Sequence, residues 1–447
     1  MNYKSSDSST PNDLRPKRAS IKALGCRLNQ YEALTIESKL KSRGYEMVPF
    51  GDKAELGIIN TCTVTKEADS KSRSVIRKFI RKNPNAITIV LGCYSQISAN
   101  EIASINGVDY VIGNHDKTNF FNHIVEEKTK DPIIVRDRID RNDFSIGFVG
   151  ETNYLQRANL KIQDGCDFMC TFCVIPFARG RARSREWKDL FSEAKLMLKR
   201  GVQEIILTGV NIGTYRSEEN DFLELVAKLS ELTNLKRLRI SSIEPTTIPH
   251  KLFDWMADPK HCLMPYLHVP MQSGCDSILK GMKRKYDLSE MRRFFQNATS
   301  KVPNLCLGTD LMVGFPGEDQ GKFQETCDTF MEFPFNYCHV FTYSERNGTP
   351  ASKMREQVPM DERRRRSAWL RRLSASKKMS FNLDQVGKEL SVLIENPKEE
   401  EFSGYSDNYV KVLVNDGFKE LSNRVSRIKI VDSRPEYVIG EWIAFEQ

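Results

Sequence analysis

Short apolar runs alternate with polar, helix-forming stretches along most of this chain, and that alternation limits the fold more than any other feature. The first three runs cover residues 20–24, 56–60 and 87–91. Strands that alternate with helices form parallel sheets with helices on their faces. The sequence therefore predicts an α/β protein whose first domain, residues 19–130, is built on a parallel sheet.

The rest of the chain divides into a connector and two further domains. After a charged connector at residues 131–150, six strand candidates follow at 160–163, 204–207, 238–241, 266–269, 306–313 and 337–342. Six strand–helix units predict a partial or full parallel barrel over residues 151–383. Alternation around Val410, Val412 and Val414 and a following Asp-Gly pair predict a small all-β barrel over residues 384–447.

The termini and the charge balance limit the class of protein. Residues 1–18 are polar and rich in Ser, which predicts a disordered tail rather than a signal peptide. No apolar run reaches about 18 residues, so we expect no membrane partner. The net charge of +8 is compatible with a polyanionic partner without requiring one. We expect a cytoplasmic protein whose eleven cysteines stay reduced and either bind metal or are buried.

Three cysteines lie close together in the sequence, at Cys166, Cys170 and Cys173. Three thiolates in C-x3-C-x2-C spacing can hold three irons of a four-iron cluster and leave the fourth open. An open iron can chelate S-adenosylmethionine (SAM), which the cluster then cleaves to a 5′-deoxyadenosyl radical. Phe172 would pack near the adenine of SAM. The alternatives are a zinc site and three buried thiols, but structural zinc takes four protein ligands, and no fourth Cys or His lies nearby in the sequence.

The sequence around these cysteines, IQDGCDFMCTFCVIPFARGRARSR, resembles the methylthiotransferase family of radical SAM enzymes. Further matches follow in order: LTGVNIGTY, RISSIEP, LHVPMQSGCDSILKGMKRKY, GTDLMVGFPGE and FTYSERNGTPA. The resemblance covers nearly the whole chain after the tail. It implies SAM contacts at motif positions that could instead be ordinary strand-end residues: Gly209, Glu244, Gln272, Ser273 and Asp310, with His268 either at the SAM pocket or in a core or surface role.

A second set of cysteines, Cys26, Cys62 and Cys93, is spread over the first domain. Each follows a predicted strand, and carboxyl ends of parallel strands meet at one edge of a sheet. Plain burial is the alternative. The resemblance implies that these three bind an auxiliary four-iron cluster whose open iron carries the inserted sulfur, with Asn29 and Asn60 nearby. The remaining cysteines are predicted to pack in the interior: Cys262, Cys275, Cys306, Cys327 and Cys338.

The resemblance also implies a reaction that uses SAM twice. One SAM methylates a sulfur on the auxiliary cluster, and the radical from a second removes hydrogen from C2 of an adenine, which receives the methylthio group. An aromatic C–H bond is too inert for side-chain acid–base chemistry, so a cofactor must supply the radical. Both clusters must then face one cavity, and we expect the first domain to close over the barrel mouth.

The substrate is harder to assign from sequence. The family modifies tRNA adenosines beside the anticodon or an aspartate of a small ribosomal protein, and GCRLNQYE (residues 25–32) resembles the subgroup acting on N6-threonylcarbamoyladenosine. A predicted helix at 361–381 lies in a segment, 353–378, with ten Lys and Arg against three acidic residues. It could contact phosphates or be a solvated helix with ion pairs. A basic run after the cysteine loop could meet the substrate's phosphates or the SAM carboxylate, or could be a solvated charged loop: Arg179, Arg181, Arg183 and Arg185.

The last domain favours a different substrate. It resembles a TRAM domain, a module that commonly binds RNA, yet residues 386–447 carry eight basic and twelve acidic residues, a net charge of −4. Such a charge fits a basic ribosomal protein better than RNA.

The predicted function is methylthio transfer to C2 of N6-threonylcarbamoyladenosine at position 37 of tRNA. The alternatives are N6-isopentenyladenosine in tRNA, the ribosomal aspartate, or a non-catalytic RNA-binding protein with a zinc site. We expect a monomer that receives electrons from a flavodoxin or ferredoxin, with the sulfur donor left open.

Overall fold

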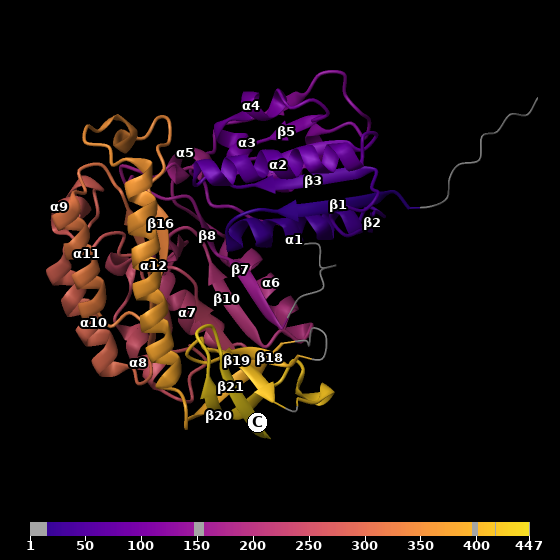
Figure 1. The fold of residues 1–447 in the computed structure, drawn as a ribbon. Helices are drawn as coiled ribbons and strands as arrows, with labels where there is room; N and C mark the ends of the chain where they lie inside the picture. The colour runs from indigo at the N-terminus through magenta and orange to yellow at the C-terminus, as the bar shows by residue number, and fades with distance from the viewer. Residues whose placement is uncertain (1–15, 147–155, 396–400, 416, 447) are drawn as a thin grey trace, which may run out of the picture.

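The computed structural model describes residues 16–146, 156–395, 401–415 and 417–446, and they form three domains (Figure 1). The N-terminal domain is a six-stranded parallel sheet in the order β2-β1-β3-β4-β5-β6. Its strands are β1 (Arg18–Ala23), β2 (Glu46–Met47), β3 (Leu56–Thr61), β4 (Ile87–Gly92), β5 (Tyr110–Ile112) and β6 (Ile133–Val135). The three strands predicted here lie within two residues of these bounds.

Helices cover both faces of this sheet. They are α1 (Arg27–Lys41), α2 (Lys66–Lys82), α3 (Cys93–Ile97), α4 (Ala99–Ala103) and the 3-10 helix η1 (Lys117–His123). Ile36 and Leu40 of α1 and Phe120 of η1 share one core with the sheet, whereas Phe79 of α2 and Ile102 of α4 share the other. Each face of the sheet is therefore sealed, as a parallel sheet requires.

The connector after the first domain differs from the prediction. Instead of being irregular throughout, it contributes β6, which pairs parallel to β5 with Ile133 opposite Tyr110. The strand is three residues long, and its two isoleucines are exposed at the sheet edge, so it lacks the buried apolar run that identifies the other strands. The predicted tail falls outside the described residues except for 16–18, and β1 already begins at Arg18.

The middle domain is an open, partial barrel. Two parallel three-stranded sheets, β13-β10-β7 and β14-β15-β16, are joined by bridges from Leu238 to Leu263 and from Ser242 to His268. The strands are β7 (Arg157–Lys161), β10 (Glu204–Thr208), β13 (Arg237–Ile240), β14 (Tyr266–His268), β15 (Cys306–Val313) and β16 (Tyr337–Thr342). All six predicted strands are present, and the barrel is partial because no pairing joins β7 to β16 among the described residues.

Helices surround this barrel on the outside (Figure 1). They are α6 (Trp187–Lys199), α7 (Phe222–Ser230), α8 (Lys251–Ala257), α9 (Asp276–Gly281), α10 (Leu288–Lys301), α11 (Gln320–Glu332) and α12 (Met360–Leu383). The short helix α5 (Ile175–Arg179) lies instead against the N-terminal domain, where Asn114 bonds it. Capping boxes begin two of them, Asp221 with Glu224 at α7 and Asp287 with Glu290 at α10. Two short antiparallel pairs complete the domain: β8 (Gln163–Asp164) with β9 (Arg183–Ser184), and β11 (Arg216–Ser217) with β12 (Asn220–Asp221).

The C-terminal domain is a closed five-stranded barrel in the order β17-β18-β19-β21-β20. Its strands are β17 (Glu389–Ile394), β18 (Ser403–Ser406), β19 (Lys411–Asn415), β20 (Val425–Ser433) and β21 (Val438–Phe445). Val410, Val412 and Val414 point into its core as predicted. The predicted Asp-Gly turn includes residue 416, which lies outside the described residues.

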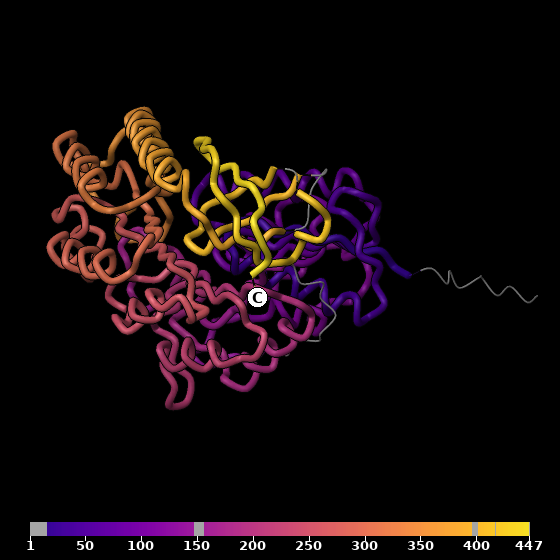
Figure 2. The backbone as a smooth tube through the Cα atoms, turned by 90° about the horizontal axis from the view of Figure 1, so that it is seen from below, coloured from indigo at the N-terminus to yellow at the C-terminus, as the bar shows by residue number. Residues whose placement is uncertain are grey.

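Buried arginines attach this barrel to the middle domain, and Figure 2 shows it in yellow against the rest of the molecule. Arg237 donates to the carbonyl oxygen of Tyr405 at 3.0 Å, and Arg239 donates to those of Ser406 and Asp407 at 3.1 and 2.9 Å. Glu204 neutralises Arg239 at 2.9 Å. No helix in the described part of the chain is long and apolar enough to cross a membrane.

Candidate functional site

The cysteines of the N-terminal domain all lie at the carboxyl edge of its sheet. Cys62 and Cys93 directly follow β3 and β4, and Cys26 comes three residues after β1. These strands are neighbours in the order β1-β3-β4, so the backbone brings the three cysteines to one place. Burial, together with the neighbouring thiols of Cys93 and Cys26, raises the pKa of the Cys62 thiol to about 11.

Two asparagines, Asn29 and Asn60, hold the loops that carry these cysteines. The Asn29 amide donates to the carbonyl oxygens of Leu24 at 2.7 Å and Thr61 at 2.9 Å, and Asn60 donates to the Asn29 carbonyl at 3.0 Å. Asn114, which the sequence analysis missed, donates to Cys93 Sγ at 3.4 Å and to the carbonyl of Ala178 in α5 at 2.6 Å. It therefore links the first set of cysteines to the helix that follows the second set.

The second set, Cys166, Cys170 and Cys173, occupies the loop between β8 and α5. Each sulfur accepts a hydrogen bond: from the Phe168 amide at 3.5 Å, from Arg284 at 3.3 Å and from the Ile175 amide at 3.4 Å, respectively. Burial raises the pKa of Cys166 to about 11 and that of Cys173 to about 12. Three sulfurs that each have a donor suit cluster ligation, because such hydrogen bonds tune iron–sulfur centres.

An ionic network lies between the two sets of cysteines, in the interior of the domain junction. We use this name for Glu32, Lys117, Lys161, Asp164 and Arg179. Arg179 Nη1 lies 3.0 Å from Glu32 Oε1 and 3.0 Å from Asp164 Oδ1, and Lys161 Nζ lies 2.8 and 2.6 Å from carboxylate oxygens of the same two residues. Lys117 pairs with Glu32. Burial alone would raise the pKa of Glu32. Arg179 and the two lysines nevertheless hold this pKa well below its usual value.

The four arginines of the predicted basic run differ in how deeply they are buried. Arg179 and Arg185 are buried, at 1% and 0% exposure, and Arg185 pairs with Asp189 at 2.6 Å and with Glu193. Neither belongs to a solvated loop, and neither guanidinium is open to a phosphate. Arg183 is largely buried, 3.8 Å from Asp140, and Arg181 is exposed.

A cavity of about 890 Å³ extends into the open barrel from Cys26, which is the one predicted ligand cysteine among its described lining residues; we call it the junction cavity. All three domains line it, with Cys26 and Arg27 from the first, Gly209 and Asp310 from the second and Tyr409 from the third. His268 lines it too, hydrogen-bonded to Asp310 at 2.8 Å. The sequence analysis singled out neither Arg27 nor Tyr409.

The other residues predicted around SAM are not all brought together. Glu244 pairs with Arg284 beside Cys170. Gln272 has φ of 70° and bridges β15 through its backbone. Ser273 is buried against Thr326 at 3.3 Å, and Phe172 packs edge-on to Phe315 at 6.4 Å. Of the predicted set, Gly209 and Asp310 face the junction cavity.

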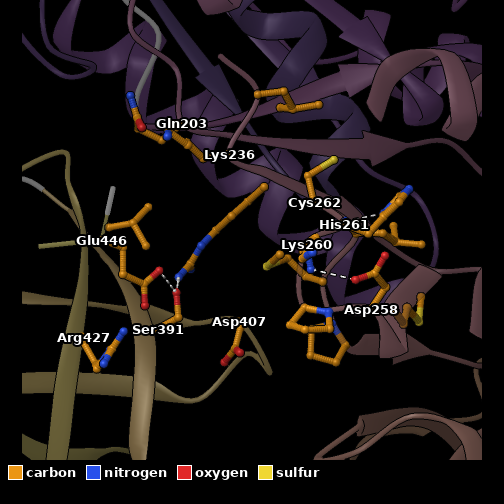
Figure 3. A pocket seen from close by; sticks show the side chains of 18 of the residues that line it. Gln203, Lys236, Asp258, Lys260, His261, Cys262, Ser391, Asp407, Arg427 and Glu446 are labelled. Atoms are coloured by element: carbon orange, nitrogen blue, oxygen red, sulfur yellow. Dashed lines mark hydrogen bonds between the residues drawn. The ribbon is translucent and has the colours of Figure 1, made fainter. Parts of the chain in front are cut away.

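A larger cavity, about 1140 Å³, lies elsewhere (Figure 3). It opens between the amino ends of the barrel strands and the C-terminal domain, and Lys236, Lys260, Asp407 and Glu446 line it. None of the six predicted ligand cysteines is among its described lining residues. Size alone therefore does not identify the functional site.

Comparison with known proteins identifies the class of enzyme. The model described as the Radical SAM superfamily matches residues 160–330, and the one described as uncharacterized protein family UPF0004 matches residues 18–113. A solved radical S-adenosylmethionine methyltransferase, TsrM from Kitasatospora setae, superposes with a TM-score of 0.57 at 14% identity, over 75% of this chain and 77% of that one. The fold and the cysteine motif define a radical SAM enzyme.

Curated relatives narrow the class. The threonylcarbamoyladenosine tRNA methylthiotransferase MtaB of Bacillus subtilis is 36% identical over 94% of this chain and 95% of its own length. The protein of the same name from Aquifex aeolicus is 33% identical over 91% and 99%. A tRNA-2-methylthio-N(6)-dimethylallyladenosine synthase from Anaplasma phagocytophilum is 31% identical over 94% and 97%. This chain belongs to the methylthiotransferase family of radical SAM enzymes.

Proposed function

We propose that this enzyme transfers a methylthio group to C2 of N6-threonylcarbamoyladenosine beside the anticodon of tRNA. Cys166, Cys170 and Cys173 would hold the cluster that binds SAM, and Cys26, Cys62 and Cys93 would hold an auxiliary cluster. When bound, these groups supply the 5′-deoxyadenosyl radical and the transferred sulfur. The observation that carries the proposal is that two sets of three thiols flank one domain junction with a cavity beside them.

The chain's own residues support this assignment through what they hold in place. Arg284 and two backbone amides donate to the sulfurs of the second set. Asn29 and Asn114 fix the loops of the first set. The junction cavity gives a base room between three domains.

The choice of tRNA over a ribosomal protein rests on the curated relatives that carry the name threonylcarbamoyladenosine tRNA methylthiotransferase. The net negative charge of the C-terminal domain favoured the ribosomal substrate. Part of that charge is neutralised by the middle domain, because Glu395 pairs with Arg157 at 3.1 Å and Glu436 pairs with Lys378. An acidic, TRAM-like barrel is therefore compatible with tRNA that is gripped mainly by other domains.

Nucleoside mass spectrometry of tRNA from a deletion strain tests the substrate. We expect 2-methylthio-N6-threonylcarbamoyladenosine to disappear and N6-threonylcarbamoyladenosine to accumulate. Loss of the dimethylallyl counterpart, or an unmodified ribosomal aspartate, would assign the chain to the corresponding alternative.

Cysteine substitution tests the two clusters. After anaerobic reconstitution we expect about eight irons per chain in the natural protein and about four when either set of three is changed to alanine. Alanine at 26, 62 and 93 should preserve SAM cleavage and abolish methylthio transfer, whereas alanine at 166, 170 and 173 should abolish both. Cys262→Ala, outside both sets, should keep all eight. Zinc without iron would contradict the proposal.

We further propose a cytoplasmic monomer supplied with electrons by a flavodoxin or ferredoxin. A reducing compartment keeps the thiols available for iron. Size-exclusion chromatography with light scattering tests the monomer, and reduction of the reconstituted enzyme by each electron carrier tests the donor.

A further inference from the structure

Arg27 directly follows Cys26 and begins α1, and its side chain lines the junction cavity. Its Nη2 donates to the Tyr409 hydroxyl of the C-terminal domain at 2.7 Å. The residue is half-buried, and within the part of the chain that the structure describes no carboxylate forms an ion pair with it. A half-buried guanidinium with no carboxylate partner is an unusual feature, because desolvated charges are normally paired.

The other basic residues that line the cavity are ion-paired, neutral or exposed. Arg179 belongs to the ionic network, and Lys378 pairs with a glutamate of the C-terminal domain. Burial and the neighbouring His268 lower the pKa of His339, which keeps its ring neutral near pH 7. Lys411 is exposed at the rim. Arg27 is therefore the one cation of this described lining that is both inside the cavity and unpaired.

Tyrosine rings line the cavity beside Arg27, and the nearby guanidinium groups favour an anion at this place. Tyr409 packs against Tyr405 and Tyr266, with ring centroids 4.9 and 4.4 Å away. Burial alone would raise the pKa of Tyr409. The guanidinium groups of Arg27 and Arg157 nevertheless lower this pKa. A planar ligand that ends in an anion would find both a stacking surface and a counter-ion here.

We propose that Arg27, with the Tyr409 hydroxyl beside it, binds the carboxylate of the threonyl group on N6 of the target adenosine. This inference rests on the proposed function and adds the source of its selectivity. A guanidinium pairs with a carboxylate through two parallel hydrogen bonds. A dimethylallyl group has no charge to offer, so it would leave Arg27 desolvated and unpaired, which disfavours that substrate. Because Arg27 adjoins Cys26, the same contact would bring the base to the auxiliary site.

Binding of anticodon stem-loops tests the proposal. The reconstituted enzyme, without reductant, is titrated with RNAs that differ only at position 37: N6-threonylcarbamoyladenosine, its threonine amide, and unmodified adenosine. We expect the carboxylate form to bind roughly 10- to 100-fold more tightly than the amide, since one charged hydrogen-bonded contact distinguishes them. In Arg27→Met the carboxylate and amide RNAs should bind with about equal affinity, while the affinity for the unmodified loop stays unchanged.

Matched variants separate this role from a loss of structure. Arg27→Lys keeps the positive charge but cannot form two parallel hydrogen bonds, so it should retain part of the preference for the carboxylate RNA. Arg43→Met, an exposed arginine of the same domain, should retain all of it. Iron content should remain about eight in every variant. In turnover, Arg27→Met should raise KM for the threonylcarbamoyl substrate, whereas Arg43→Met should leave that KM unchanged.

Two outcomes would overturn the inference. Either Arg27→Met discriminates carboxylate from amide as well as the natural enzyme does, or the natural enzyme does not discriminate. If either occurs while the deletion strain still lacks 2-methylthio-N6-threonylcarbamoyladenosine, the proposed function stands and only the role of Arg27 fails. If the deletion strain retains that nucleoside, the proposed function itself fails.

Discussion

Gly25 has φ of +89° and lies against Cys62. A Cβ at this position would lie 2.6 Å from Cys62 Cβ and 2.7 Å from its Sγ, closer than any relaxed contact. Gly25→Ala should therefore displace Cys62 and lower reconstituted iron from about eight toward about four per chain. Gly348→Ala is the control, because Gly348 has a similar φ of +86° but nothing within 4 Å of the added carbon. Equal iron in both variants would rule out crowding at Cys62.

The positions of the cysteines and of the neighbouring Asn29 and Asn60 were predictable from sequence at this scale, whereas the contacts made by Asn114 and Tyr409 were not. The spacing of Cys166, Cys170 and Cys173 is local, and the strand-end positions of the other three follow from the sheet pattern. The role of Arg27 depends on Tyr409, which is 382 residues away along the chain, so local spacing carries no signal of it. Its position next to Cys26 was the one available hint.

Helix α12 shows what sequence predicts about elements and what it misses. The predicted bounds, 361–381, are close to the observed Met360–Leu383, because the run contains no helix breaker. The run of arginines, however, is neither uniformly solvated nor uniformly open to phosphate. Arg363 and Arg366 are buried, the latter 2.7 Å from Glu318. Which side of the helix would be covered depended on loops far away in the chain.

Arg364, Arg371 and Lys378 lie seven residues apart on α12, which places them along one side of the helix. The two arginines are exposed, and Lys378 reaches the junction cavity. We expect Arg364→Gln with Arg371→Gln to weaken binding of every tRNA alike. The slope of log affinity against log salt should become shallower by about one to two.

A charge-matched control tests that result. Lys228→Gln with Lys251→Gln removes two exposed cations from α7 and α8 and should leave the slope unchanged. An identical slope in both double variants would show that this side of α12 does not contact phosphate.

For the whole molecule, the ionic network joins the N-terminal domain to the barrel, because Glu32 and Lys117 come from one and Lys161, Asp164 and Arg179 from the other. Arg179→Met leaves buried carboxylates short of a partner and should lower the free energy of unfolding by about 3–5 kcal/mol. Urea denaturation measures it. Arg181→Met, at an exposed site two residues on, should change it by less than about 0.5 kcal/mol. Equal effects would contradict a stabilising role for the network.

The same network gives a pH dependence. The folded-state pKa of Glu32 lies well below its usual value of 4.5, so its stabilising contribution is complete above that value and is lost as pH falls through the lowered pKa. The difference between Arg179→Met and the natural protein should therefore shrink in acid. A difference that stays constant down to the lowest pH at which the protein remains folded would contradict this linkage.

The three-domain layout was predictable because the alternation of strands and helices is repeated in the sequence. The contacts between the domains were not predictable. The joint to the C-terminal barrel uses the carbonyl oxygens of Tyr405, Ser406 and Asp407. Every amino acid carries such an oxygen, so these hydrogen bonds do not depend on the side chains at those positions. Substitution of the loop's tyrosines would remove the contact of the Tyr405 ring with Arg157 but would leave those hydrogen bonds in place, so the cavity wall can change its substrate preference while part of the joint persists.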